Sequence, residues 1–136
     1  MTVSMRGGNV TTSDCHPSTE AFLRAKLRLN RLPKLQYKAW HWQSDDPQLG
    51  RFDLIIDSDL PCERDRPAQL AAFVQFRASP QAEVLIVDPD RGNRRDFQRC
   101  MEQLDFRMMA TKIDEPLADR SSYRGRLLNC RRGTHV

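Results

Sequence analysis

Acidic side chains follow three short apolar segments of this sequence, at the points where strands would end. They are Asp14, then Asp57 with Asp59, then Asp88 with Asp90. An acid at the end of a parallel strand can accept hydrogen bonds from ribose hydroxyls, as in dinucleotide-binding folds. The structural alternative is that aspartate also caps helices and turns. Three such acids in succession favour a nucleoside-type crevice over a set of unrelated caps.

Cysteine and histidine offer weaker chemistry. The four cysteines, Cys15, Cys62, Cys100 and Cys130, include no CxxC pair, and the three histidines have no metal-ligand spacing. Widely separated cysteines of this kind are typical of reduced, structural thiols. Neither Cys15 beside His16 nor Cys62 in its polar turn has a recognisable catalytic base, so we predict neither a metal site nor cysteine catalysis.

The composition favours a soluble, cytoplasmic chain. Of its 136 residues, 39% are hydrophobic and 29% are charged, and the net charge is +4. No apolar run approaches the roughly 18 residues that a membrane span needs, and no signal peptide is found at Met1. The basic excess lies late, at Arg120, Arg124, Arg126, Arg131 and Arg132, without a nucleic-acid-binding motif. A solvated basic tail therefore explains it better than nucleic-acid binding does.

Strands and helices are expected to alternate along the chain. RFDLIIDSDLPCE contains the segment Phe52–Ile56, which is short and apolar like a strand in the middle of a parallel sheet. The other predicted strands are Gly7–Ser13, Leu35–Trp42, Glu83–Val87, Phe106–Ile113 and Tyr123–Arg131, the last two antiparallel. Predicted helices span Pro17–Leu32, Ala68–Phe76 and Asn93–Leu104. This alternation predicts an α/β fold with a mostly parallel sheet.

Each predicted helix has an apolar face at helical spacing. The faces consist of Ala21, Phe22, Ala25, Leu29 and Leu32 in the first helix, Leu70, Phe73 and Val74 in the second, and Phe97, Cys100, Met101 and Leu104 in the third. We expect these side chains to pack against the sheet.

The order of these features resembles class I S-adenosylmethionine-dependent methyltransferases, within them the branch of protein-lysine methyltransferases and bacterial relatives. The resemblance rests on VTTSDCHPSTEAFLRAKLRLNRLP, a strand ending in HW, FDLIIDSDLPCERDRP and AEVLIVDPDRGNRRDF. It implies one Rossmann-like methyltransferase domain over residues 1–136. That domain would have helices on both faces of its sheet and an antiparallel strand pair at the end. Val10–Ser13 and Phe52–Ile56 would be the second and fourth strands of the family.

The same resemblance implies a set of site residues. Asp14 would hold the ribose of S-adenosylmethionine, His41 and Trp42 would lie beside its adenine, and Asp57, Ser58 and Asp59 would border the site of methyl transfer. The methyl acceptor implied by this branch is a protein, and no metal is needed.

The sequence also departs from the family. Only thirteen residues precede Asp14, so the first strand and its glycine-rich loop are not found. His41 stands where the family usually has an acid or amide, and Cys62 where it usually has a tyrosine. Because the first strand lies between the second and the fourth, its loss would expose two sheet edges. We expect those two strands to pair directly, or two copies to pair as a homodimer.

Two functions are compatible with these features. The first is a methyltransferase-like domain that binds S-adenosylmethionine but has weak or no activity as an isolated chain. The second is a non-catalytic remnant that serves as a binding or assembly module.

Overall fold

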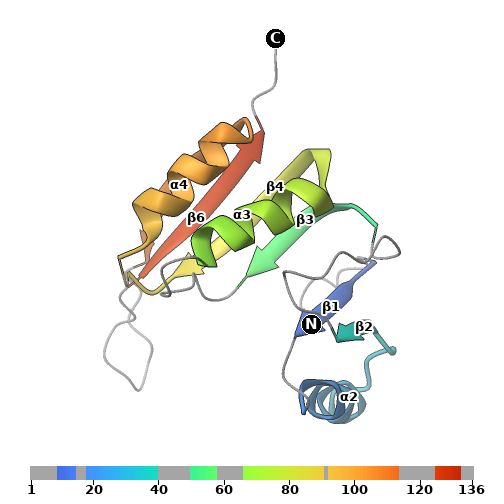
Figure 1. Ribbon diagram of the computed structural model, residues 1–136. Coiled ribbons are helices and arrows are strands. Elements are labelled where there is room, and N and C mark those ends of the chain that lie inside the picture. The colour runs from blue at the N-terminus through green and yellow to red at the C-terminus, as the bar shows by residue number, and fades with distance from the viewer. Residues whose placement is uncertain are drawn as a thin grey trace. The chain divides into compact units, whose positions relative to one another are not determined.

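A computed structural model describes residues 9–14, 18–39, 50–57, 66–90, 92–113 and 125–132. The chain divides into two compact units, Met1–Asp45 and Asp46–Val136, and the single domain expected over residues 1–136 stays a prediction. The first unit contains β1 (Thr11–Asp14), α2 (Thr19–Leu29) and β2 (Gln36–Ala39) (Figure 1). The second contains β3 (Phe52–Asp57), α3 (Arg66–Arg77), β4 (Ala78–Asp88), α4 (Arg94–Gln103), β5 (Phe106–Ile113) and β6 (Gly125–Arg132). The predicted alternation of strands and helices is confirmed.

The first unit is a β–α–β unit with two parallel strands. β1 pairs with β2 from Thr11 opposite Gln36 to Asp14 opposite Ala39, and α2 connects them. The side chain that α2 buries is Leu27, whereas the predicted inward residues Phe22 and Leu29 are 70% and 85% exposed.

That prediction of the buried face was wrong because α2 carries two apolar rows. Phe22 and Leu29 belong to one row, and Leu23 and Leu27 belong to the other, one turn apart. Helical spacing identifies both rows but does not say which of them packs inward.

The second unit is built on a four-stranded sheet in the order β3-β4-β6-β5. β3 and β4 are parallel, while β6 is antiparallel to both β4 and β5. The antiparallel pair predicted at the end of the chain is therefore confirmed. β6, which comes last in the sequence, lies between two strands that precede it.

β3 is an edge strand of this sheet, which corrects the predicted central position of Phe52–Ile56. It pairs with β4, from Phe52 opposite Ala78 to Asp57 opposite Ile86. β1 and β2 form the sheet of the first unit, and the direct pairing expected between β3 and the strand after Val10 stays a prediction. With one neighbour instead of two, β3 buries Ile55 but leaves Leu54 40% and Ile56 56% exposed.

The core of the second unit lies between one face of its sheet and the helices α3 and α4. Figure 1 shows both helices on that face, rather than one on each. The side chains buried there include Leu70, Val74, Val84, Ile86, Phe97, Met101 and Leu128. Alternate residues of β4 point into this core, as the two-residue period of a strand requires. The inward positions predicted for Leu70, Val74, Phe97 and Met101 are confirmed.

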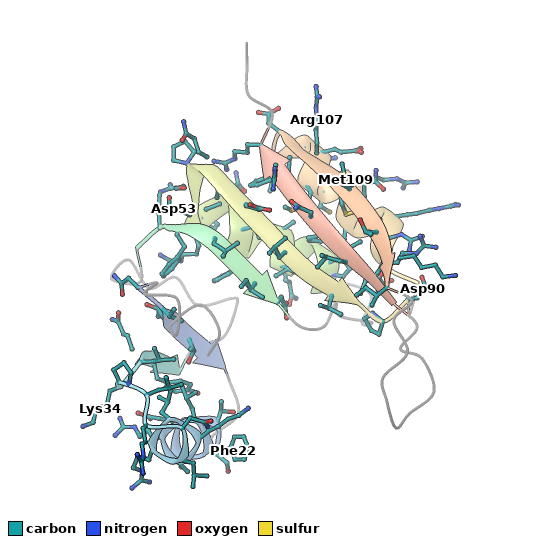
Figure 2. All side chains as sticks on the ribbon, turned by 180° about the vertical axis from the view of Figure 1, so that it is seen from behind. Phe22, Lys34, Asp53, Asp90, Arg107 and Met109 are labelled. Atoms are coloured by element: carbon teal, nitrogen blue, oxygen red, sulfur yellow. The ribbon has the colours of Figure 1, made fainter. Side chains whose placement is uncertain are left out.

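The opposite side of the sheet, here called the open face, carries a second apolar surface. Its apolar residues are Leu54, Ile56, Leu85, Val87, Met109 and Leu127. Figure 2, drawn from behind Figure 1, views the sheet from this side and labels Met109 on β5. None of the described helices of the second unit covers it, and none of the described helices is long and apolar enough to span a membrane.

The amino end of β4 is held by side-chain bonds to backbone carbonyls. β4 starts at Ala78, directly after α3, and not at Glu83 as predicted. Arg51 Nη1 donates to the carbonyl oxygen of Ala78 (2.9 Å), and Arg77 Nη1 donates to that of Gly50 (3.4 Å). A register shift between Phe52 and Leu54 accommodates the additional β4 residues. These bonds hold the junction at which β4 follows α3 without a turn between them.

Candidate functional site

The predicted strand ends carry acids in the structure. Asp14 is the last residue of β1, Asp57 the last of β3 and Asp88 the last of β4. The remaining predicted cofactor residues, His41, Trp42, Ser58 and Asp59, lie outside the described residues.

Asp57 and Asp88 lie at the same end of the four-stranded sheet, because β3 and β4 are parallel neighbours and each ends at one of these residues. Asp57 is half-buried and is opposite Ile86, so β4 continues two residues further to Asp88. In open α/β sheets, ligands bind beyond the carboxyl ends of parallel strands. Asp57 ends β3 at that end of the sheet, and its place at the border of a ligand crevice stays a prediction.

Asp88 has a structural role that the sequence did not reveal. Its side chain is buried, and Oδ1 accepts a hydrogen bond from the backbone N–H of Asp90 (2.9 Å). This bond closes a turn in which Asp90 (φ 65°) and Gly92 (φ 107°) adopt left-handed conformations. Aspartate tolerates that conformation better than most residues, and glycine does so without steric cost. The VDPDRG segment is thus a tight turn anchored by Asp88.

Arg94 neutralises the acids of this turn. Its Nη1 lies 3.3 Å from Asp90 Oδ1 and 3.8 Å from Asp88 Oδ2. Asp88 Oδ2 is buried and has no hydrogen-bond partner among the described residues, but it lies within ion-pair distance of Arg94. The third acidic strand end is accordingly a turn anchor rather than a ribose-binding group. The role of Arg94 was not predicted from the sequence, although an arginine four residues after Asp90 at a helix start indicates such an ion pair.

The described cysteines do not provide a nucleophile. Burial raises the pKa of the Cys130 thiol to about 12, so this group stays protonated at neutral pH. Cys100 is half-buried in α4. Among the described residues, no group of three or more His, Cys, Asp or Glu side chains could hold a metal ion.

The first strand of the first unit ends at Asp14, the residue predicted to hold a ribose. β1 and β2 are parallel and joined by α2, and β1 ends at Asp14. This is the arrangement in which an acid at a strand end accepts hydrogen bonds from ribose hydroxyls. The role of Asp14 toward the ribose of S-adenosylmethionine stays a prediction.

Comparison with known proteins identifies the fold. No protein-family model and no curated protein sequence matches the chain. Among solved structures, it is similar to magnesium protoporphyrin IX methyltransferase (ChlM) from Synechocystis with bound SAM. The TM-score is 0.67 and the identity is 17%, over 97% of this chain and 63% of that protein. It is also similar to a SAM-dependent methyltransferase from Methanosarcina mazei, with a TM-score of 0.71 and 11% identity, over 96% of this chain and 85% of that one.

A third similar structure, TehB from Haemophilus influenzae, matches with a TM-score of 0.65 and 12% identity over 96% of this chain. The chain spans 52% of TehB and 63% of ChlM, so it corresponds to about half to two thirds of those proteins. These similarities establish the Rossmann-like fold of class I methyltransferases for this chain. At such low identities, they establish the fold alone.

Proposed function

We propose that this chain is a methyltransferase-like domain that binds S-adenosylmethionine. The observation that carries the proposal is the fold similarity, over 97% of the chain, to ChlM, whose structure contains bound SAM. The acid that ends β1 in a parallel β–α–β unit supports it further, because that position suits a ribose-binding carboxylate.

The proposed roles of the site residues follow from their positions. Asp14 would accept hydrogen bonds from the ribose, and His41 and Trp42 would lie beside the adenine. Asp57, Ser58 and Asp59 would border the methyl-transfer site after β3. The bound cofactor supplies a methyl group already activated by a positively charged sulfur. The task of these residues is therefore orientation rather than proton transfer.

Independent turnover by this chain is expected to be weak or absent. The sequence before Asp14 contains no glycine-rich loop, whose backbone would approach the methionine end of the cofactor closely. The proposed methyl acceptor is a protein, in line with the branch that the sequence resembles.

Calorimetric titration with S-adenosylmethionine and S-adenosylhomocysteine tests the proposal. We expect saturable binding of both ligands, weakened at least about tenfold by Asp14→Ala, since loss of a charged hydrogen-bond partner costs about 1.5–3 kcal/mol. Asp96→Ala, at an exposed position on α4, is the matched control and should bind like the unmodified chain. Equal weakening by both variants would contradict the assigned role of Asp14.

A second pair of variants tests the end of β3. Asp57→Asn should weaken binding of S-adenosylmethionine, whereas Asp53→Asn should not. Both residues belong to β3, but Asp53 lies at its amino end, where its Oδ1 accepts a hydrogen bond from Ser79 Oγ (2.7 Å). If binding is unchanged in Asp57→Asn, this residue is not part of the cofactor site.

The second candidate function is a non-catalytic binding or assembly module. The observation in its favour is the edge position of β3, with Leu54 and Ile56 exposed. Absence of any heat of binding or change in Trp40 and Trp42 fluorescence at millimolar ligand would exclude the first function and leave this one.

A further inference from the structure

The edge of β3 that faces away from β4 is the strongest candidate for an interaction surface. We propose that two copies of this chain pair through β3, antiparallel and centred on Leu54, so that their four-stranded sheets form one continuous sheet. The partner is a second copy of this chain, and the pairing of the two copies does not depend on cofactor binding.

An edge strand presents unpaired backbone N–H and C=O groups that can pair with another strand. Proteins usually protect such edges with charged residues, and the two edges of this sheet differ in this respect. β5, at the opposite edge, carries only positive charges, Arg107 and Lys112, so two copies of it would repel each other. β3 and the residue before it carry both signs, Arg51 with Asp53 and Asp57.

The positions of these charges select one register. In an antiparallel pair related by a two-fold axis normal to the sheet, facing residues lie on the same side of the sheet. Centring on Asp53 would place Asp53 opposite Asp53, and centring on Ile55 would place Asp53 opposite Asp57. Like charges directly opposite each other are destabilising. Centring on Leu54 avoids both pairs.

The register centred on Leu54 also creates favourable charge pairs. It places Arg51 of each copy opposite Asp57 of the other, so the charge pair occurs twice. Arg51 uses Nη1 for the carbonyl oxygen of Ala78, and a guanidinium has five N–H donors, so others are available for a carboxylate. Opposite charges across a strand pair stabilise it.

The same register joins the apolar surfaces of the two copies. In this register Leu54 lies opposite its counterpart, on the side of the sheet that forms the open face, and Ile56 lies opposite Phe52 of the second copy. Leu54 and Ile56 are the β3 side chains of that face, and among the described strands of the second unit each has a neighbouring strand in only one direction. A second copy supplies the missing neighbour and removes apolar surface from water.

Charge exchange tests the proposal, with the molar mass measured by sedimentation equilibrium. The unmodified chain should associate to twice the monomer mass, whereas Arg51→Asp and Asp57→Arg should each weaken self-association at least about tenfold, because each creates two like-charge pairs. An equimolar mixture of the two single variants should dimerise again, and so should the double variant R51D/D57R. Arg107→Asp, the same charge change on β5, is the matched control and should dimerise like the unmodified chain.

Each result of these mass measurements leads to a different conclusion about the pairing of β3. A monomeric unmodified chain would overturn the proposal, as would a dimer that is insensitive to both single variants or a failure of the mixed variants to associate. A dimer that Arg107→Asp disrupts would assign the interface to β5 instead. The readout is mass alone, so a failure of cofactor binding through the change at Asp57 cannot be mistaken for a failure of pairing.

Discussion

The two faces of the four-stranded sheet are both apolar but differ in what covers them. On the helix-covered face, Val84, Ile86 and Leu128 are fully buried beneath α3 and α4. On the open face, Leu54 and Ile56 of β3 and Leu127 of β6 remain exposed. The core of this unit therefore forms by packing on one face of the sheet. The apolar side chains of the other face are available for contact with further polypeptide.

Substitution of two methionines, one on each face, tests this difference and has the largest expected effect on stability. Met101 on α4 is 0% exposed, and Met109 on β5 is 71% exposed. Met101→Ala should lower the free energy of unfolding by about 2 to 5 kcal/mol, because it leaves a cavity in the core. Met109→Ala should change it by no more than about 0.5 kcal/mol. Urea unfolding measures both, and a comparable loss at Met109 would mean that the open face is covered in solution.

A pH test of intermediate size concerns Cys130, on the helix-covered face. Burial raises its pKa from the ordinary 9.0 to about 12, so the unfolded chain releases this proton before the folded one does. Its contribution to stability is complete below pH 9 and is lost between pH 9 and about 12, by up to about 1.4 kcal/mol per pH unit. In Cys130→Ala, this part of the pH dependence should disappear.

Alkylation provides an independent measurement of the same burial. Peptide mass spectrometry at neutral pH should find Cys130 modified more slowly than the half-buried Cys100. Equal rates would indicate that the helix-covered face opens readily.

The smallest expected effect concerns Glu83, on the open face. Its Oε1 accepts hydrogen bonds from Arg131 Nη2 (3.0 Å) and Asn129 Nδ2 (2.8 Å), and the bond from Arg131 is the main reason that its pKa lies below 4.5. A lowered pKa stabilises the fold above pH 4.5, and this contribution is lost as the pH falls through the lowered value. Arg131→Gln should raise the pKa of Glu83 toward 4.5 in an NMR titration.

Arg107 provides the control for that titration, because it lies opposite Arg131 in β5. Arg107→Gln removes a charge of the same sign, but the structure gives it no bond to Glu83. A similar rise in both variants would attribute the shift to general charge rather than to the bond from Arg131.

Sequence patterns predicted where strands and helices lie along the chain better than they predicted which strands are neighbours and which helix face is buried. The limits of β5 and the buried positions Val74, Phe97 and Met101 were predicted correctly, because they depend on local spacing. The edge position of β3 was not, because an apolar run does not reveal how many neighbours a strand has. The wrong face was chosen for α2 for the same reason, since two apolar rows compete and only tertiary packing selects Leu27.

The candidate site was predictable only as far as its strand ends. Asp14, Asp57 and Asp88 were each expected after a strand and do follow one. The different role of Asp88 depends on its burial, on the backbone N–H of Asp90 and on the side chain of Arg94. These are three-dimensional relations that an acidic residue in a sequence shares with many unrelated turns.

The place of β6 between β4 and β5 has a consequence for biosynthesis. The ribosome makes β4 and β5 first, yet these two strands are not neighbours, and the space between them is filled by β6, which is translated after both. A nascent chain that has emerged only as far as β5 therefore exposes an incomplete sheet to chaperones and to other nascent chains. Folding of this unit should be completed only once Gly125–Arg132 has left the exit tunnel.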